Sequence, residues 1–228
     1  MAHTQEKTRL QKFSENLAKF LAANWKKVII FIVAGIIIIV GLGIVSQINN
    51  RKINKSSVAL EALEKMYEEE WTSAEEDADK SEIKNKITTD AESIITDYEG
   101  LYAAQKALLI LGNIAYEEEN WSKAAGYFTS IADNSIDSFM APIALMYAAS
   151  SMEEAGDLEA SRDLFNRVIN EYPGAPQEVM RARFNYGRLE EALGNSEAAV
   201  DMYNSLIDID AQDPWSMLAQ SRIIFLSK

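Results

Sequence analysis

Acidic side chains are the residues of this sequence whose number and grouping could support chemistry. Runs of carboxylates stand at 68–70, 75–77 and 117–119. Carboxylate oxygens suit Ca²⁺, but a dedicated calcium loop places its oxygen ligands at alternating positions along the chain. None of the three runs has that spacing. We interpret them as solvated surfaces that could bind calcium only loosely, and we expect no metal site.

Nucleophilic and redox chemistry lacks its usual residues in this sequence. The chain has no cysteine, and its single histidine is His3. Disulfides, thiolate catalysis and cysteine-based metal sites are therefore excluded. The sequence contains neither a zinc-binding HExxH nor a phosphate-binding G-x-x-x-x-G-K-[ST] loop, and no His–Asp–Ser arrangement can be assembled. We expect no catalytic residue, no cofactor and no small-molecule substrate, and predict that the protein is not an enzyme.

A repeated pattern organises the second half of the chain. The segments 105–134, 142–173 and 180–210 align without gaps. Equivalent positions hold a small residue and, farther on, an aromatic one. The small residues are Gly112, Ala149 and Gly187, and the aromatic residues are Phe128, Phe165 and Tyr203. A unit of this size cannot bury its apolar face alone, so its copies must stack into a solenoid that binds other chains.

The pattern resembles the tetratricopeptide repeat (TPR), a pair of antiparallel helices about 34 residues long with Leu-Gly, an aromatic residue, Ala, Phe and Pro at fixed places. The first copy supplies these features as Leu111, Gly112, Tyr116, Ala124 and Phe128. The copies begin at positions 105, 142 and 180, so each loop between repeats is a few residues longer than the family norm. The resemblance implies an all-α solenoid of antiparallel helix pairs.

The ends of the array have their own signatures. Residues 94–100 parallel residues 168–174, which predicts the second helix of a degenerate first repeat, with its first helix at 58–71. The polar and acidic stretch 72–86 is expected to be a loop or a loosely held insertion. Residues 215–226 are predicted to form a single closing helix, because a short array needs caps.

An apolar run precedes the repeats. Residues 28–48 carry no charge, and as a helix they span about 30 Å, the hydrocarbon thickness of a bilayer. A cleaved signal peptide would have a shorter apolar core, nearer to its start, followed by a small-x-small cleavage site, which the sequence after Val45 does not offer. We predict a single, uncleaved N-terminal transmembrane helix in front of the TPR-like solenoid. The alternative is a buried core helix.

Basic residues flank this span unequally. Those before it are Lys7, Arg9, Lys12, Lys19, Lys26 and Lys27, and those after it are Arg51, Lys52 and Lys55. Because basic loops stay on the cytoplasmic side, we predict a cytoplasmic N-terminus and a repeat domain on the other side. The residues expected to set this orientation are Lys26, Lys27, Arg51 and Lys52.

The N-terminal flank also has an apolar periodicity. Apolar residues recur at helical spacing, with lysines between them: Leu10, Phe13, Leu17, Phe20 and Leu21. This pattern is typical of an amphipathic helix that lies in the membrane interface. The alternative is a plain helical extension of the anchor. The expected parts are then a tail at 1–27, a span at 28–48, a linker helix and degenerate repeat at 49–104, three repeats at 105–214 and a capping helix at 215–228.

Charge divides the chain in the same way. Residues 1–55 hold 9 of the 22 Lys+Arg and 2 of the 35 Asp+Glu residues, a net charge of +7, so the remainder carries −20. A basic tail is attracted to anionic headgroups, whereas an acidic domain is repelled by them and by phosphates. Nucleic-acid binding is therefore disfavoured.

The TPR resemblance also implies where a partner binds, since in such families the contacts come from the first helix of each unit. The implied residues are Lys106, Leu109, Asn113, Tyr116, Ile143, Met146, Tyr147, Ser150, Arg181, Phe184, Asn185 and Arg188. This set differs from the Lys, Asn and Arg residues with which chaperone-binding TPRs hold a terminal carboxylate, and suits an extended or helical polypeptide. The alternative is that Leu109, Ile143 and Phe184 pack the inner seam of the array.

The order of parts resembles a more specific group. A basic tail, an Asn-Trp-Lys-Lys sequence at 24–27 leading into one span, the junction at 97–112 and acidic repeats are similar to the YfgM-type family. That resemblance implies a bacterial inner-membrane protein with a periplasmic repeat domain, which assists a membrane-anchored chaperone and exported proteins at the Sec translocon. A structural adaptor of an envelope, secretion or motility complex and a mitochondrial-type outer-membrane receptor remain as alternatives.

Overall fold

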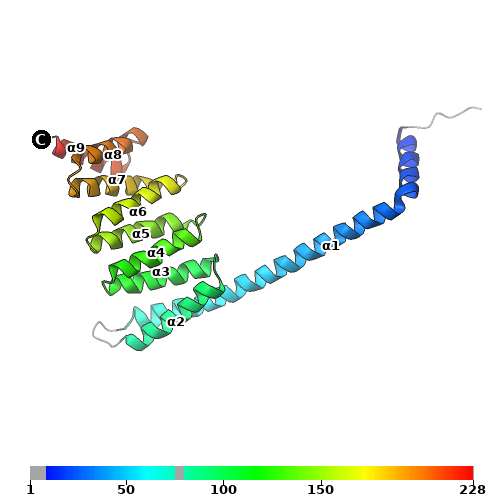
Figure 1. Ribbon diagram of the computed structural model, residues 1–228, viewed down its shortest axis with the longest axis horizontal. Helices are drawn as coiled ribbons and strands as arrows, with labels where there is room; N and C mark the ends of the chain where they lie inside the picture. Colours follow the sequence, from blue (N-terminus) through cyan, green and yellow to red (C-terminus); the bar gives the residue numbers. More distant parts are fainter. Residues whose placement is uncertain (1–8, 75–79, 228) are drawn as a thin grey trace, which may run out of the picture. The chain divides into compact units, whose positions relative to one another are not determined.

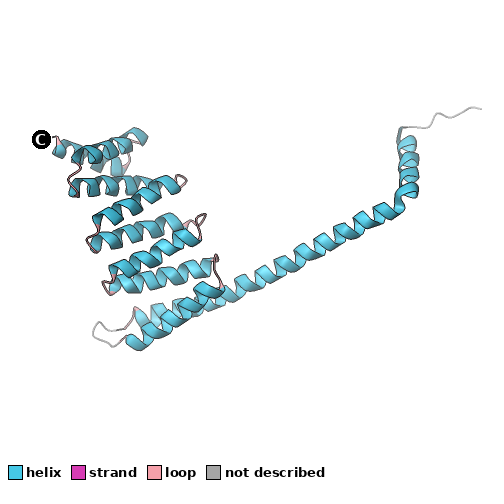
Figure 2. Cartoon of the chain, viewed as in Figure 1, coloured by secondary structure: helices cyan, strands magenta, loops and turns pink. Residues whose placement is uncertain are grey.

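The structure, a computed structural model, describes residues 9–74 and 80–227, apart from the side chains of Leu10 and Gln11. His3, Lys7, the acidic run 75–77 and the side chain of Leu10 lie outside these descriptions. All regular structure within the described ranges is helical (Figure 2), which confirms the predicted all-α fold. Its helices are α1 (Arg9–Met66), the π-helical segment η1 (Tyr67–Trp71), α2 (Ser81–Asp97), α3 (Tyr102–Glu117), α4 (Trp121–Asn134), α5 (Met140–Glu154), α6 (Leu158–Glu171), α7 (Pro176–Ala192), α8 (Ser196–Ile209) and α9 (Pro214–Leu226).

The chain divides into two compact units, Met1–Asn54 and Lys55–Lys228. The first unit contains most of α1, and its most apolar stretch has a mean hydropathy of 3.3 with none of it buried. By length and composition, this helix could cross a membrane. The helical path is broken at Asn24 (φ −122°, ψ 18°), where the side-chain amide donates to the carbonyl of Phe20 at 3.1 Å. The break separates the helix that carries Phe13, Leu17 and Phe20 from the apolar run.

The second unit is a stack of antiparallel helices in chain order (Figure 1), in which each helix from α2 to α9 packs mainly on its neighbours in sequence. The pairs α3–α4, α5–α6 and α7–α8 correspond to the three repeats. Before these repeats in the chain, the end of α1 and η1 pack against α2 through Leu63, Trp71, Ile87 and Ala91. The expectation of a loop over 72–86 is wrong in its second half: α2 begins at Ser81, because Ile83 and Ile87 lie one helical turn apart and pack on that core.

Small residues let the two helices of a repeat cross closely. A Cβ atom added to Gly112 would lie 2.3 Å from Cε1 of Phe128, and one added to Gly187 would lie 2.6 Å from Cε1 of Tyr203. Such distances are well inside van der Waals contact, so the aromatic ring occupies the space that a side chain would need. The second repeat has Ala149 at this position, buried in one cluster with Phe165. The small residue and the aromatic residue of the sequence pattern therefore contact each other across the two helices of a repeat.

The turns inside the three repeats share one hydrogen-bond pattern. The amides of Asn120, Asp157 and Asn195 each donate to the carbonyl five residues earlier, at 2.8, 3.0 and 2.8 Å. This is the Schellman arrangement, which requires a left-handed residue just before the donor. Gly156 (φ 80°) and Gly194 (φ 82°) satisfy this requirement without strain, whereas the first repeat uses Glu119 (φ 58°).

We predict that Gly112→Ala destabilises the repeat domain by about 1–3 kcal/mol, because the new methyl group displaces the ring of Phe128. Gly126→Ala is the matched control, since Gly126 is exposed inside α4 with open space at its Cβ position. That change should stabilise by about 0.5–1 kcal/mol through helix propensity. Thermal unfolding followed by circular dichroism measures both, and equal shifts would contradict the close-crossing argument.

Candidate protein-binding groove

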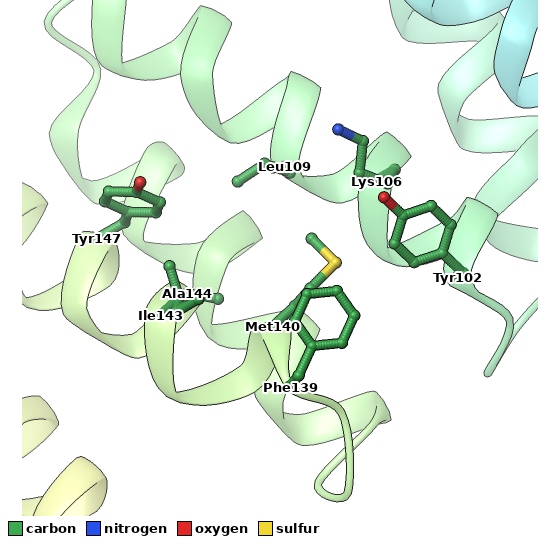
Figure 3. A pocket seen from close by; sticks show the side chains of 8 residues that line it. All are labelled: Tyr102, Lys106, Leu109, Phe139, Met140, Ile143, Ala144 and Tyr147. Carbon is green, nitrogen blue, oxygen red and sulfur yellow. The ribbon is translucent and has the colours of Figure 1, made fainter. Parts of the chain in front are cut away.

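The first helices of the repeats form two adjoining hollows. One, of about 230 Å³, lies between α3 and α5 (Figure 3) and is lined by Tyr102, Lys106, Leu109, Phe139, Met140, Ile143, Ala144 and Tyr147. The other, of about 300 Å³, lies where α5, α7 and α9 meet and is lined by Ile143, Met146, Tyr147, Gln177, Glu178, Arg181 and Trp215. Ile143 and Tyr147 belong to both hollows. Together they form one continuous surface, which we call the groove.

Helical spacing on two helices produces the first hollow. On α3, Tyr102 and Lys106 are one turn apart, and on α5 the same spacing joins Ile143 to Tyr147. The rings of Tyr102 and Phe139 stack across the two helices, with centroids 6.4 Å apart and an interplanar angle of 21°. Both rings remain exposed, Phe139 by 71%. The hollow therefore offers two large aromatic faces to a partner.

A core contact fixes the position of Tyr147. Its ring lies 5.5 Å, centroid to centroid, from the ring of Phe128, the same ring that covers Gly112. Tyr147 is nevertheless 44% exposed on its other side. The contact that joins the helices of the first repeat thus also orients a groove residue in the second.

Most cations on this face are neutralised within the chain. Lys106 Nζ lies 3.1 Å from a carboxylate oxygen of Glu64, and the guanidinium of Arg188 donates to both oxygens of Glu153 at 2.6 Å. Those hydrogen bonds raise the pKa of Arg188 above its usual value. Arg181 is exposed and has no ion-pair partner among the residues that the structure describes. The groove is therefore largely apolar, with one free positive charge beside Glu178.

The predicted contact residues divide into groups. Those that line the groove and are at least partly exposed are Lys106, Leu109, Ile143, Tyr147 and Arg181. Those that line neither hollow are Asn113, Tyr116, Ser150, Phe184, Asn185 and Arg188. Several of the latter are engaged locally: the ring of Tyr116 packs edge-on against Trp121 at 4.7 Å, and Ser150 and Asn185 bond to carbonyls of their own helices. Burial, with Glu154 and Glu153 nearby, raises the pKa of the Tyr116 phenol, which stays neutral.

Two predicted contact residues pack within the array: Met146 is buried in the core, and Phe184 is partly buried against it. Met146 is predicted to face outward, but it is only 3% exposed because it packs in the buried cluster of the second repeat. It still forms part of the lining of the second hollow. The ring of Phe184 lies 5.7 Å from that of Tyr203 and 5.4 Å from that of Trp215, between α7, α8 and α9. Phe184 therefore fits the alternative interpretation, in which an apolar residue packs the seam.

Several groove residues were missed by the sequence analysis. Tyr102 and Phe139 stand just before the aligned copies begin, and Gln177 and Glu178 stand in the first turn of α7. Each of the helices α3, α5 and α7 starts before the aligned sequence segment that it belongs to. The groove therefore extends about one turn further toward the N-termini of these helices. The spacing of four from Tyr102 to Lys106 and from Phe139 to Ile143 is the signal that could have shown this.

Two acidic residues of the run 117–119 join the first repeat to the helical elements that precede it. Glu117 accepts a hydrogen bond from Nε1 of Trp71 at 2.7 Å, and Glu118 accepts one from Nζ of Lys84 at 2.7 Å. These contacts join the end of α3 to η1 and α2. Within the described ranges no group of three or more His, Cys, Asp or Glu side chains is arranged to hold a metal ion.

We predict that Phe184→Ala and Ile143→Ala have different effects on stability. Loss of the Phe184 ring leaves a cavity beside Tyr203 and should cost about 2 kcal/mol or more. Ile143 is 37% exposed and lines an open hollow, so its truncation should cost less than about 1 kcal/mol. Chemical denaturation of the two variants measures the difference, and a larger cost for Ile143→Ala would place it in the core instead.

Comparison with known proteins identifies the family. A family profile described as a tetratricopeptide repeat-like domain matches residues 18–171, and one described as a tetratricopeptide repeat matches residues 177–214. A TPR repeat-containing protein of Treponema pallidum (strain Nichols) is 32% identical over 128 residues, which cover 55% of this chain and 52% of that protein. The chain thus spans about half the length of this relative. Since the first profile covers more than half of the chain, and the helix pairs follow its repeats, the chain belongs to the tetratricopeptide repeat-like domain family.

Proposed function

We propose that this chain is a membrane-anchored scaffold whose groove binds segments of other proteins. TPR repeats form scaffolds for protein–protein interaction and are generally not catalytic. The observation that carries the proposal is the groove itself. It exposes the rings of Tyr102, Phe139 and Tyr147 around an apolar hollow, on a domain that is otherwise strongly acidic. Exposed aromatic clusters of this kind supply most of the affinity at protein interfaces.

The groove favours an apolar polypeptide segment that carries a carboxylate. Because Lys106 and Arg188 are already paired with Glu64 and Glu153, they offer little charge to a partner. Among the described residues that line the groove, Arg181 is the cation without an ion-pair partner, and it lies in the second hollow with Trp215. Apolar side chains of the segment would fill the first hollow, and its carboxylate would reach Arg181.

The anchor in this proposal is α1. Its most apolar stretch is unburied, which supports a membrane span over a core helix of this chain. Trp25 and the adjacent lysines stand at one end of the run, with Nζ of Lys26 5.8 Å from the centre of the Trp25 ring. Tryptophan and basic residues are enriched where a span meets the cytoplasmic headgroups. The proposed topology is a cytoplasmic N-terminus, set by Lys26 and Lys27 against Arg51 and Lys52, and a periplasmic repeat domain.

The proposed site of action is the Sec translocon of a bacterial inner membrane. There the groove would hold exported chains beside a membrane-anchored chaperone. The support for this role is the order of parts: a basic tail, one apolar helix and acidic repeats, as in the YfgM-type resemblance. The alternative is a structural adaptor of an envelope, secretion or motility complex, which would hold one partner at a fixed ratio.

We expect a photoreactive residue at Tyr147 to crosslink to translocon subunits, the chaperone or exported chains in intact membranes. The reason is that Tyr147 borders both hollows. Adding Ile143→Glu should lower the yield about tenfold, because a charge is then introduced into the apolar surface. The control is the same probe at Glu159, which is exposed on α6. A single crosslinked partner at a constant ratio would favour the adaptor. Equal crosslinking yields from the probes at Tyr147 and Glu159 would refute the groove as the binding site. Crosslinks to cytosolic proteins alone would refute the topology.

Reversing the charge of Lys26 and Lys27 tests the orientation. In spheroplasts, external protease should digest the repeat domain of the parent chain, and Lys26→Glu with Lys27→Glu should leave a substantial fraction protected, because the positive flank is lost. The matched control is Lys86→Glu with Lys123→Glu, the same charge change on exposed residues of the repeat domain. A repeat domain that is protected in every form would contradict the predicted topology.

A further inference from the structure

The last helix of the stack, α9, has two apolar faces. Ser216 and Ala219 are buried against the preceding helices, with Ile223 and Leu226 packed beside them. The opposite face carries large apolar side chains that remain exposed: Met217 by 51%, Leu218 by 49%, Ile224 by 61% and Phe225 by 63%. The polar residues Gln220 and Arg222 stand between these two faces, so the exposed apolar side chains form a separate face of the helix.

Among the residues that the structure describes, no element covers this outer face. The sequence predicted a closing helix at 215–226, and α9 does close the core on its inner side. Its outer side exposes a second apolar surface. Exposed apolar patches of this kind mark binding sites.

Charge opposes a second copy of this chain least at α9. The chain beyond residue 55 carries a net charge of −20, yet residues 214–227 contain neither Asp nor Glu. Arg222 of α9 is neutralised within the chain, since its Nε donates to Glu191 at 3.0 Å. Two copies of an acidic domain repel each other over most of their surfaces, and α9 is a face where this repulsion is weak.

The layout of the face is symmetric about a small residue. Met217 and Leu218 lie one turn before Ser221, and Ile224 and Phe225 lie one turn after it. The Ser221 hydroxyl donates to the carbonyl of Met217 at 3.2 Å, so it presents no unsatisfied polar group and little bulk. A small residue at the centre allows two helices to approach closely.

We propose that α9 pairs antiparallel with α9 of a second copy, around a two-fold axis at Ser221. Met217 and Leu218 of each copy then pack on Ile224 and Phe225 of the other, which is the self-complementary arrangement that a two-fold interface requires. Four side chains from each copy bury less than the roughly 1,200 Å² of a stable soluble complex. Confinement of both copies to one bilayer by α1, which rests on the function proposed above, raises their effective concentration.

Cysteine crosslinking tests the pairing directly, because the natural chain has no cysteine. Full-length Ser221→Cys chain, reconstituted in liposomes or concentrated in detergent, should form disulfide-linked dimers about tenfold faster than Ser93→Cys, an exposed serine on α2. Met217→Cys alone should crosslink poorly, whereas a mixture of Met217→Cys and Ile224→Cys chains should crosslink well. Equal rates at 221 and 93 would overturn the proposal, and efficient crosslinking of Met217→Cys to itself would overturn the antiparallel arrangement.

A second variant separates pairing from folding. Ile224→Glu in the Ser221→Cys chain should reduce the dimer about tenfold, because pairing would bury a carboxylate against Met217 and Leu218. Ile136→Glu is the control, since Ile136 is 60% exposed in the loop before α5. Circular dichroism should show both chains folded. Dimers unaffected by Ile224→Glu would refute the interface. Failure of the chain to float with liposomes while dimers still form in detergent would refute the anchor only.

Discussion

The packing of one aromatic ring over one small residue is the contact on which this fold depends. Phe128 fills the space above Gly112, and Tyr203 fills the space above Gly187, so the helices of these two repeats lie closer than a Cβ atom at either glycine would allow. The same ring then contacts the next repeat, since Phe128 also lies against Tyr147. The ring of Phe128 therefore joins the two helices of the first repeat and also contacts the second repeat, so a groove residue is positioned by the core.

Because each helix packs mainly on its neighbours in sequence, the first and last helices of the stack each lack a neighbour on one side. The two ends are covered in different ways. At the start, the end of α1 and η1 supply the missing helix, fastened through Trp71 to Glu117. At the other end, α9 covers Tyr203 and Leu206 but brings its own apolar outer face. In a quasi-one-dimensional fold the end elements determine what the array can join. One end continues into the long helix α1, and the other presents an apolar helix.

Much of the fold could be predicted from the sequence because the governing contact is between residue types at a fixed spacing. Gly112 with Phe128 and Gly187 with Tyr203 identify the helix pairs without knowledge of any other part. Glu119 could not be predicted as a left-handed residue, because its type does not favour that conformation and only comparison with Gly156 and Gly194 suggests it.

The groove was less predictable for the same physical reason. Whether a first-helix residue faces a partner or the next repeat depends on the position of the neighbouring helices. Met146 and Tyr147 are adjacent in sequence, yet one is buried and the other is exposed. Phe184 is held by Trp215, a contact across residues far apart in the chain. Helical periodicity gives the direction of a side chain, whereas its exposure depends on packing between repeats.

The distribution of charge limits what such a surface can bind. Many cations of the repeat domain join neighbouring elements: Lys106 to Glu64, Arg167 to Asp133, Arg188 to Glu153 and Arg222 to Glu191. Each pair contributes at most about 1 kcal/mol at a solvated surface, but together they leave the excess carboxylates unpaired on the outside. That excess repels nucleic acids and anionic membranes. Under the two proposals above, the largely apolar groove and the outer face of α9 are the surfaces on which an approaching chain gains contact area without opposing charge. The acidic surface would then determine where binding occurs as well as what is excluded.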